Sequence, residues 1–287
     1  MTAPKHILVP IDFSEASLKA LPVAQRMAGE GGRLDVIHVL HELPPGHPAA
    51  MWGKLGAEER CENVKAEMRR VLKGLELDHA GVIARVQEGN PARVIVDVAA
   101  ELGVDQIIIP SHGRHGVPRL VLGSVAEVVV RRAACPVMVL RGAEEPVWPP
   151  EVVLVPVDFT ERSWQAIEQA RELVESPSAL QVAHVLADLS HMEPGMFWGT
   201  IDTGARVERT VGFIKERLAA RGLEEAGVHV FVAVGNAGSH IAHLAEDMGA
   251  DLVVIGTQGR TGLSRLVLGS VAERAVRLCP CPVLALH

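Results

Sequence analysis

The residues Arg119-Leu-Val-Leu-Gly-Ser-Val-Ala-Glu127 recur without a single change as residues 265–273. The stretch Leu8-Val-Pro-Ile-Asp12-Phe13 recurs in the same way as Leu154-Val-Pro-Val-Asp158-Phe159, and His38-Val39 recurs as His184-Val185. The same interval separates the two copies each time, because 158 − 12, 184 − 38 and 269 − 123 all equal 146. A constant interval across 287 residues predicts two copies of one domain, joined head to tail.

The segment between the copies is rich in proline. Residues 143–150 read Ala-Glu-Glu-Pro-Val-Trp-Pro-Pro, which is typical of a short, stiff linker. We therefore expect a first domain over residues 1–142, a linker over residues 143–150 and a second domain over residues 151–287.

Each copy alternates between strand and helix patterns. In the first copy we expect strands over residues 6–11, 33–40, 82–87, 105–110 and 136–140, and helices over residues 14–29, 57–75, 91–102 and 124–132. Such alternation predicts an α/β fold in which a parallel sheet is covered by helices on both faces. The expected fold class is two tandem, open, parallel-sheet domains of Rossmann-like type.

The overall composition excludes several classes of protein. A net charge of −7 without any Lys/Arg-rich run argues against a nucleic-acid partner. Apolar runs such as Leu252–Gly256 are too short to span a membrane, and no signal-peptide pattern is seen, so we expect a cytoplasmic location. The four cysteines form no C-x-x-C pair, which favours reduced thiols over a redox or metal site.

A glycine-containing loop follows the fourth strand of each copy. In the second copy it reads Gly256-Thr-Gln-Gly259, then nine residues, then Gly269-Ser270 at the start of a helix. The free N–H groups of a helix N-terminus attract phosphate, and Arg260 adds positive charge to the loop. The alternative is structural, because Ser270 with Glu273, like Ser124 with Glu127, also fits a capping box that satisfies the helix end by itself.

Two further features fall at the same edge of the expected sheet, where ligands of parallel sheets bind. Asp12 and Asp158 follow the first strand of each copy, and each could contact a ribose or a metal, or could instead cap the next helix. His38 and His184, near the end of the second strand, are expected to be packed core residues rather than ligands. Trp52 and Trp198 could pack in the core or at an interface, or could stack on a base.

Several catalytic and binding motifs are absent from the sequence. It contains no P-loop, no G-x-G-x-x-G after the first strand, no G-x-S-x-G elbow and no H-E-x-x-H pair. No pair of carboxylates or histidines recurs with the spacing of a base beside a nucleophile. We therefore expect no catalytic residue and no metal held by the protein itself.

With these residues in view, the chain resembles a tandem universal stress protein, once per copy. The ATP signature of that family, G-x2-G-x9-G-[ST], is matched completely by Gly256, Gly259, Gly269 and Ser270. The resemblance implies a fold like that of the adenine nucleotide α-hydrolases, with ATP as ligand and Mg²⁺ held mainly by its phosphates. The residues implied to bind the nucleotide in the second copy are Pro156, Asp158, Val185, Gly256, Gly259, Arg260, Gly269 and Ser270, with Asp158 on the ribose and Val185 on the adenine.

The first copy departs from this signature at one position. It reads Pro110-Ser-His-Gly113 and later Gly123-Ser124, so that a proline replaces the first glycine and removes one N–H donor. Losing one hydrogen bond would weaken binding by up to about tenfold, so we expect weaker binding in this copy. The residues implied to bind there are Pro10, Asp12, Val39, Gly113, Gly123 and Ser124.

The expected function is that of an ATP-binding regulatory module for stress responses, with a conformational output and no dedicated catalytic machinery. Two alternatives stay open, a slow Mg-dependent ATP phosphohydrolase and a nucleotide-free interaction scaffold. The resemblance also implies that the last strands, Val137–Leu140 and Val283–Leu286, pair within the chain as an intramolecular pseudo-dimer. We expect an adenine nucleotide and an unidentified protein as partners, possible further homo-dimerisation, and no membrane partner.

Overall fold

The structure is a computed structural model, and it describes residues 4–41, 57–77, 79, 81–112, 122–141, 146–189, 202–223, 227–258 and 268–287. The chain divides into two compact units, Thr2–Glu145 and Pro146–Leu286, which are called domain 1 and domain 2 below. Each is an α/β domain with the alternation of strands and helices that the sequence predicts.

Every element expected in the first copy is present in domain 1, with bounds within one residue of those expected. The elements are β1 (His6–Pro10), α1 (Glu15–Ala28), β2 (Arg33–Leu40), α3 (Ala57–Gly74), β3 (Val82–Glu88), α4 (Pro91–Leu102), β4 (Gln106–Pro110), α5 (Ser124–Arg132) and β5 (Val137–Leu140). Proline at the first position of α4, with the Asn90 side chain capping the helix, shows why that boundary could be read from the sequence.

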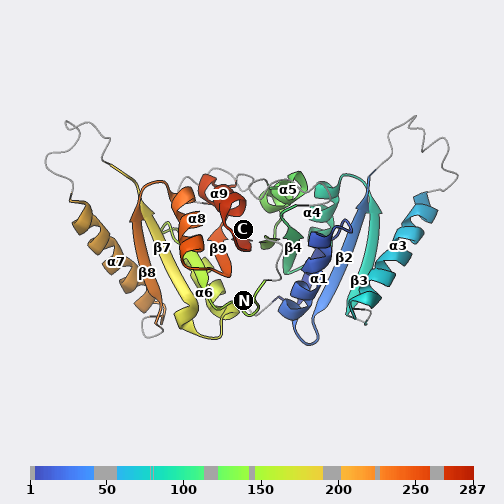
Figure 1. Cartoon of the computed structure of the whole chain (residues 1–287), viewed down its shortest axis with the longest axis horizontal. Helices are drawn as coiled ribbons and strands as arrows, with labels where there is room; N and C mark the ends of the chain where they lie inside the picture. The colour runs from blue at the N-terminus through green and yellow to red at the C-terminus, as the bar shows by residue number, and fades with distance from the viewer. Residues whose placement is uncertain are drawn as a thin grey trace. The chain divides into compact units, whose positions relative to one another are not determined.

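Domain 2 repeats this order of elements. They are β6 (Val153–Pro156), α6 (Glu161–Leu173), a 3₁₀ turn (Pro177–Ala179), β7 (Leu180–Leu186), α7 (Thr203–Ala219), β8 (His229–Val234), α8 (Ala237–Asp247), β9 (Leu252–Gly256), α9 (Ser270–Leu278) and β10 (Val283–Leu286). In Figure 1, α3 lies beside β3 and α7 lies beside β8.

The strands of each domain form a parallel sheet whose order reverses in the middle. The order is β3-β2-β1-β4-β5 in domain 1 and β8-β7-β6-β9-β10 in domain 2. The ladder between β1 and β4 joins only Ile7 to Gln106 and Leu8 to Ile107, although both strands run on beyond these pairs. The carboxyl ends of the two strands therefore part at the reversal, which is where ligands of open parallel sheets bind.

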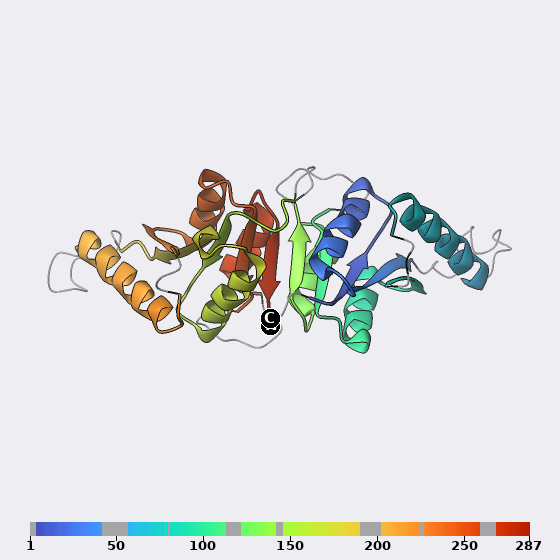
Figure 2. The same cartoon turned by 90° about the horizontal axis from the view of Figure 1, so that it is seen from below.

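Helices cover both faces of each sheet, and this explains the continuous apolar runs of the central strands. Figure 2 shows α1 (blue) and the pair α4 and α5 (green) on opposite faces of the domain 1 sheet. β5 and β6 are buried along their whole length, as expected for strands covered on both sides.

The four cysteines are free thiols, as the sequence predicts. Cys279 and Cys281 are buried, and burial raises the pKa of the Cys135 thiol to about 11. A thiol with so high a pKa is almost entirely protonated at neutral pH and reacts slowly. In the described part of the chain, none of the helices has the length and apolar character needed to cross a bilayer.

Candidate functional site

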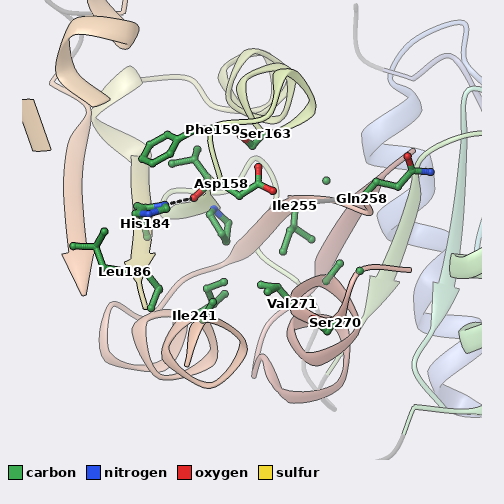
Figure 3. Close-up of a pocket in the computed structure, with 18 of the residues that line it drawn as sticks. Asp158, Phe159, Ser163, His184, Leu186, Ile241, Ile255, Gln258, Ser270 and Val271 are labelled. Atoms are coloured by element: carbon green, nitrogen blue, oxygen red, sulfur yellow. Dashed lines mark hydrogen bonds between the residues drawn. The ribbon is translucent and has the colours of Figure 1, made fainter. Parts of the chain in front are cut away.

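Each domain has a pocket at the carboxyl edge of its sheet, where the strand order reverses. The pocket of domain 2 has a volume of about 490 Å³ and that of domain 1 about 630 Å³. In Figure 3, His184, Leu186 and Ile241 lie at one end of the domain 2 pocket, and Ser270 and Gln258 lie at the other. Each pocket is thus lined both by strand ends and by the N-termini of the following helices.

The described residues that the sequence assigned to a nucleotide come together in these pockets. Those lining the domain 2 pocket are Pro156, Asp158, Val185, Gly256, Gly269 and Ser270. Those lining the domain 1 pocket are Pro10, Asp12, Val39, Gly123 and Ser124. Gly113, Gly259, Arg260, Trp52 and Trp198 lie outside the described residues.

Asp158 shapes the turn that leaves β6 rather than capping the next helix. Its Oδ1 accepts hydrogen bonds from the backbone N–H of Thr160 at 3.1 Å and from the Thr160 hydroxyl at 2.6 Å. The N-cap of α6 is Thr160 itself, whose side chain accepts from the N–H of Ser163. The structural alternative for Asp158 was therefore wrong in detail, because the cap lies two residues further along the chain.

The same arrangement occurs in domain 1. Oδ1 of Asp12 accepts from the backbone N–H of Ser14 at 3.0 Å, and Ser14 caps α1. In both domains one carboxylate oxygen of the aspartate is thus used to build the turn. Figure 3 shows the carboxylate of Asp158 between the two ends of its pocket, close to Ile255. A carboxylate held there can accept hydrogen bonds from the hydroxyl groups of a sugar.

The residue after each aspartate has an unusual backbone conformation. Phe13 and Phe159 have positive φ angles of 63° and 69°, a region that a bulky side chain rarely adopts. A residue keeps such a strained backbone conformation only when the surrounding structure stabilises it, and conformations of this type are concentrated at functional sites. The sequence shows this phenylalanine in both copies, and its recurrence is the signal by which the residue could have been found.

The paired histidine holds this turn in place. Nδ1 of His184 is 2.7 Å from the carbonyl oxygen of Val157, and Phe159 stacks on the imidazole with 4.3 Å between ring centroids (Figure 3). His184 is only 7 % exposed, and His38 makes the equivalent contact with Ile11 at 2.8 Å. Both histidines are buried, as expected from the sequence, and the structure adds that they support the turn and line the pockets.

The N-terminus of α9 forms one wall of the domain 2 pocket without a side-chain cap. The N-cap is Gly269, which has no side chain, and Ser270 is the first residue of the helix. α5 begins identically at Gly123 and Ser124. The capping box expected as the structural alternative is therefore wrong in both domains. The N-terminal residues of each helix line the pocket, and the cap residue supplies no side-chain acceptor for their N–H groups.

Gly256 directs its N–H toward the pocket. Successive N–H groups of a strand point to opposite sides. The N–H groups of Val253 and Thr257 donate to Pro282 and Leu286, which lie on the side of β10, at 3.0 and 2.8 Å. The N–H of Gly256, one residue before Thr257, therefore points away from β10 and toward β6, where the strand ends part.

Pro110 occupies the equivalent place in domain 1 without disturbing the sheet. It is the last residue of β4 and is in register with Leu140, and the next residue, Ser111, donates to the carbonyl of Leu140 at 2.9 Å. The missing N–H of the proline belongs to the side that faces β1 and the pocket. The substitution thus removes a donor from the pocket and none from the pairing of β4 with β5.

Arg206, on α7, also lines the domain 2 pocket and was not singled out in the sequence. Its Nη2 donates to the carbonyl oxygen of Ala187, the residue that follows β7, at 3.2 Å. An arginine recurs at the equivalent position of the first copy, Arg60, so the repeat carried a signal for it. In the described residues, no group of three or more His, Cys, Asp or Glu side chains could hold a metal ion.

Comparison with known sequences gives the same family for both halves of the chain. A model of the universal stress protein family matches residues 4–141 and again residues 150–287. A universal stress protein of Methanocaldococcus jannaschii is 34 % identical over 139 residues, which is 48 % of this chain and 82 % of that protein. One from Mycolicibacterium smegmatis is 26 % identical over 290 residues, which is 98 % of this chain and 96 % of that protein.

Solved structures with the same fold cover both domains. A universal stress protein from Archaeoglobus fulgidus gives a TM-score of 0.66 with 24 % identity, and the match covers 98 % of each chain. A protein from Pseudomonas aeruginosa, described as a universal stress protein, gives 0.68 with 22 % identity, covering 99 % of this chain and 93 % of that one. At this level of identity the two structures establish the shared fold.

Proposed function

Because the chain belongs to the universal stress protein family, matched once by each domain, we propose that it is an ATP-binding regulatory protein. Its principal nucleotide site is the pocket of domain 2. The observation that carries this proposal is the N-terminus of α9, whose N-cap is Gly269 and therefore has no side chain, and which lies on the pocket wall. Exposed N–H groups and the positive end of the helix dipole suit a phosphate group.

The rest of the pocket is suited to the other parts of a nucleotide. Asp158 lies where its carboxylate can accept from ribose hydroxyls, and Gly256 can donate an N–H on the same side. Val185 and Ile241 line the pocket and supply apolar walls for a flat ring. Leu186, the residue after Val185, lies at the end of the pocket remote from Ser270 (Figure 3). The proposed ligand therefore runs from α9, where the phosphates bind, to the end of β7, where the base binds.

We propose that Mg²⁺ accompanies the nucleotide and is coordinated chiefly by phosphate oxygens and water. This is the usual mode for a cation that retains several of its waters and binds through substrate phosphates. In the same view, occupancy of the pocket is the signal that the protein transmits, and no chemical step is required of its residues. We place the protein in the cytoplasm, where ATP is abundant.

Domain 1 is proposed as a second and weaker site. Its pocket contains the equivalents of most of the domain 2 residues, including the uncapped start of α5 at Gly123. Pro110 removes one donor, and a single hydrogen bond contributes about 0.5–1.5 kcal/mol, or up to about tenfold in affinity.

The decisive experiment is calorimetric titration of nucleotide-stripped protein with Mg-ATP. We expect a tighter site that is lost in Gly269→Val and a weaker site that is lost in Gly123→Val, each variant serving as the control for the other. Circular dichroism and thermal unfolding establish that both variants are folded. If the wild-type protein gives neither binding heat nor a shift in melting temperature with millimolar Mg-ATP, the proposal is wrong and the scaffold alternative stands.

A slow phosphohydrolase is distinguished by the fate of the bound nucleotide. The regulatory proposal expects intact ATP to be recovered after prolonged incubation with the protein and Mg²⁺. Release of phosphate over many turnovers, abolished by Gly269→Val, would instead establish the enzyme.

A further inference from the structure

Two equivalent arginines have different partners in the two domains. Arg60 is the fourth residue of α3 and Arg206 is the fourth residue of α7, and the two are 146 positions apart, as all repeated residues are. Arg206 lines the pocket of domain 2, whereas Arg60 is not among the residues that line the pocket of domain 1.

In domain 1 the arginine is held by a carboxylate. Nη2 of Arg60 donates to Oε1 of Glu88 in a short ion pair, and the two side chains are 27 % and 26 % exposed. Glu88 is the last residue of β3 and lies in register with Leu40. This charge-assisted pairing draws the guanidinium group to the end of the neighbouring strand.

Domain 2 has no carboxylate at that position. Val234, the last residue of β8, takes the place of Glu88 and lies in register with Leu186 in the same manner. Among the residues that the structure describes, Arg206 forms no ion pair, and its guanidinium group donates to the carbonyl oxygen of Ala187 at the pocket rim. The difference between Glu88 and Val234 at the end of the adjacent strand thus accompanies the different positions of Arg60 and Arg206.

The place of Arg206 in the pocket identifies the part of the ligand that it can reach. Ala187 follows Leu186, and Figure 3 shows Leu186 at the end of the pocket away from Ser270 and Gln258. The phosphates are proposed to bind at the α9 end, so Arg206 lies at the end assigned to the base. A guanidinium group is planar, donates without accepting, and stacks well on flat rings.

We propose that Arg206 covers the purine base in domain 2, and that Glu88 withholds Arg60 from the same role in domain 1. The inference rests on the proposed nucleotide function and adds a base-contacting residue that differs between the domains. Arg206 contributes by stacking the flat face of its guanidinium group on the base. The two pockets therefore differ in affinity for a reason separate from Pro110.

The test compares ATP with inorganic tripolyphosphate, which has the phosphates but no base. Arg206→Met should weaken ATP binding in domain 2 by about three- to tenfold, the range of a cation–π contact, and leave tripolyphosphate binding unchanged. The matched control is Arg209→Met on the same helix, since Arg209 is exposed and donates to Ala205 within α7. If Arg206→Met loses equal affinity for ATP and for tripolyphosphate, Arg206 contacts the phosphates and not the base. If Arg206→Met binds ATP as tightly as Arg209→Met does, Arg206 does not contact the nucleotide.

The part played by the neighbouring strand is tested by transferring the carboxylate. Val234→Glu should capture Arg206 and reproduce the loss seen in Arg206→Met, whereas the uncharged Val234→Gln should keep most of the affinity. Conversely, Glu88→Gln in a Gly269→Val background should raise the ATP affinity of domain 1 by a similar factor. If Val234→Glu and Val234→Gln are both folded and bind ATP with equal affinity, the carboxylate does not draw Arg206 from the base. If Glu88→Gln leaves the ATP affinity of domain 1 unchanged, Glu88 does not withhold Arg60.

The two proposals fail in different ways. If wild-type protein binds no ATP, the nucleotide function itself is wrong. If the wild type binds ATP and Arg206→Met behaves like Arg209→Met, the function stands and only the inference about Arg206 is lost.

Discussion

The amide N–H of Gly269 donates to the carbonyl oxygen of Thr257 over 2.8 Å, although twelve positions separate the two residues. Gly123 and Ser111 form the same bond, also 2.8 Å long, in domain 1. Each bond fixes the start of a helix against the end of the preceding strand. The N-terminus of α9, where the phosphates are proposed to bind, is therefore held in place by contacts within the fold.

Space at this bond is limited, and we expect an added methyl group to disturb it. A Cβ atom on Gly123 would lie 3.1 Å from the carbonyl oxygen of Ser111, closer than an ordinary contact. Gly123→Ala should therefore cost about 1 kcal/mol of stability and weaken nucleotide binding in domain 1. Gly212→Ala is the control, because nothing lies within 4 Å of that position in α7 and helix propensity should make it stabilising by about 0.5–1 kcal/mol. Thermal unfolding of the two variants measures the difference between their stability changes. If the backbone at Gly123 can shift to accommodate the methyl group without cost, Gly123→Ala will not be destabilised.

Restoring an N–H donor at position 110 should strengthen binding in domain 1. Pro110→Ala should raise its affinity for Mg-ATP by up to about tenfold, because the restored N–H faces the pocket and the β5 pairing is unaffected. An alanine fits, since Pro110 already carries a Cβ atom at this position. The converse variant, Gly256→Pro, should lower the affinity of domain 2 by a similar factor. Calorimetry on both checks the prediction, and unchanged affinities would show that this N–H does not contact the ligand.

The role of Asp158 in the turn can be separated from its proposed role at the ribose by the choice of substitution. Asp158→Asn keeps an oxygen that can accept from Thr160, so the turn should survive with a change in stability below about 0.5 kcal/mol. It loses the charge offered to the ribose, and nucleotide affinity should fall a few-fold. Asp158→Ala removes both roles and should also destabilise domain 2 by about 1 kcal/mol. In Asp158→Asn the nucleotide affinity should therefore fall while the melting temperature stays nearly unchanged. If both fall together, the role of Asp158 in the turn accounts for the loss of affinity.

Asp35 gives the stability of domain 1 a dependence on acid pH. Burial raises the pKa of this fully buried carboxyl group. Hydrogen bonds from His6 and Arg85 and the charge of Arg33 lower the pKa by more than burial raises it, so the net pKa lies below the usual value of 3.8. The native carboxylate therefore stabilises the fold above about pH 4, and this contribution is lost as the pH falls through the lowered pKa.

Asp35→Asn should accordingly cost about 2 kcal/mol at pH 7, because it leaves cationic partners partly buried without their carboxylate. The difference from wild type should shrink as the pH is lowered from 5 to 3. Gln181, which occupies the equivalent position in domain 2, provides a control, and Gln181→Asn should show no such convergence. Denaturant unfolding across this pH range is the measurement, and a difference that stays constant would contradict the assignment.

The sequence by itself determined the repeat, the bounds of the elements and the edge at which the site lies. It could do so because these depend on local or periodic information. Proline at the first position of α4 is a local signal, and the alternation of strands and helices restricts the sheet to a parallel one. Asp158 and Gly269 follow strand ends in the sequence, and parallel strands bring their carboxyl ends to one edge, so that their proximity followed from topology alone.

The tertiary structure decided which partner each side chain has. The sequence pattern suits Ser270 as a helix cap and Asp158 as another, yet the N-caps are Gly269 and Thr160, because backbone geometry at the strand end sets where each helix starts. Arg60 and Arg206 look equivalent in the repeat, but Glu88 at the end of β3 pairs with Arg60, whereas Val234 occupies the equivalent position at the end of β8. Contacts between residues distant in the chain depend on how strands are ordered and aligned, and a single sequence does not carry that information locally.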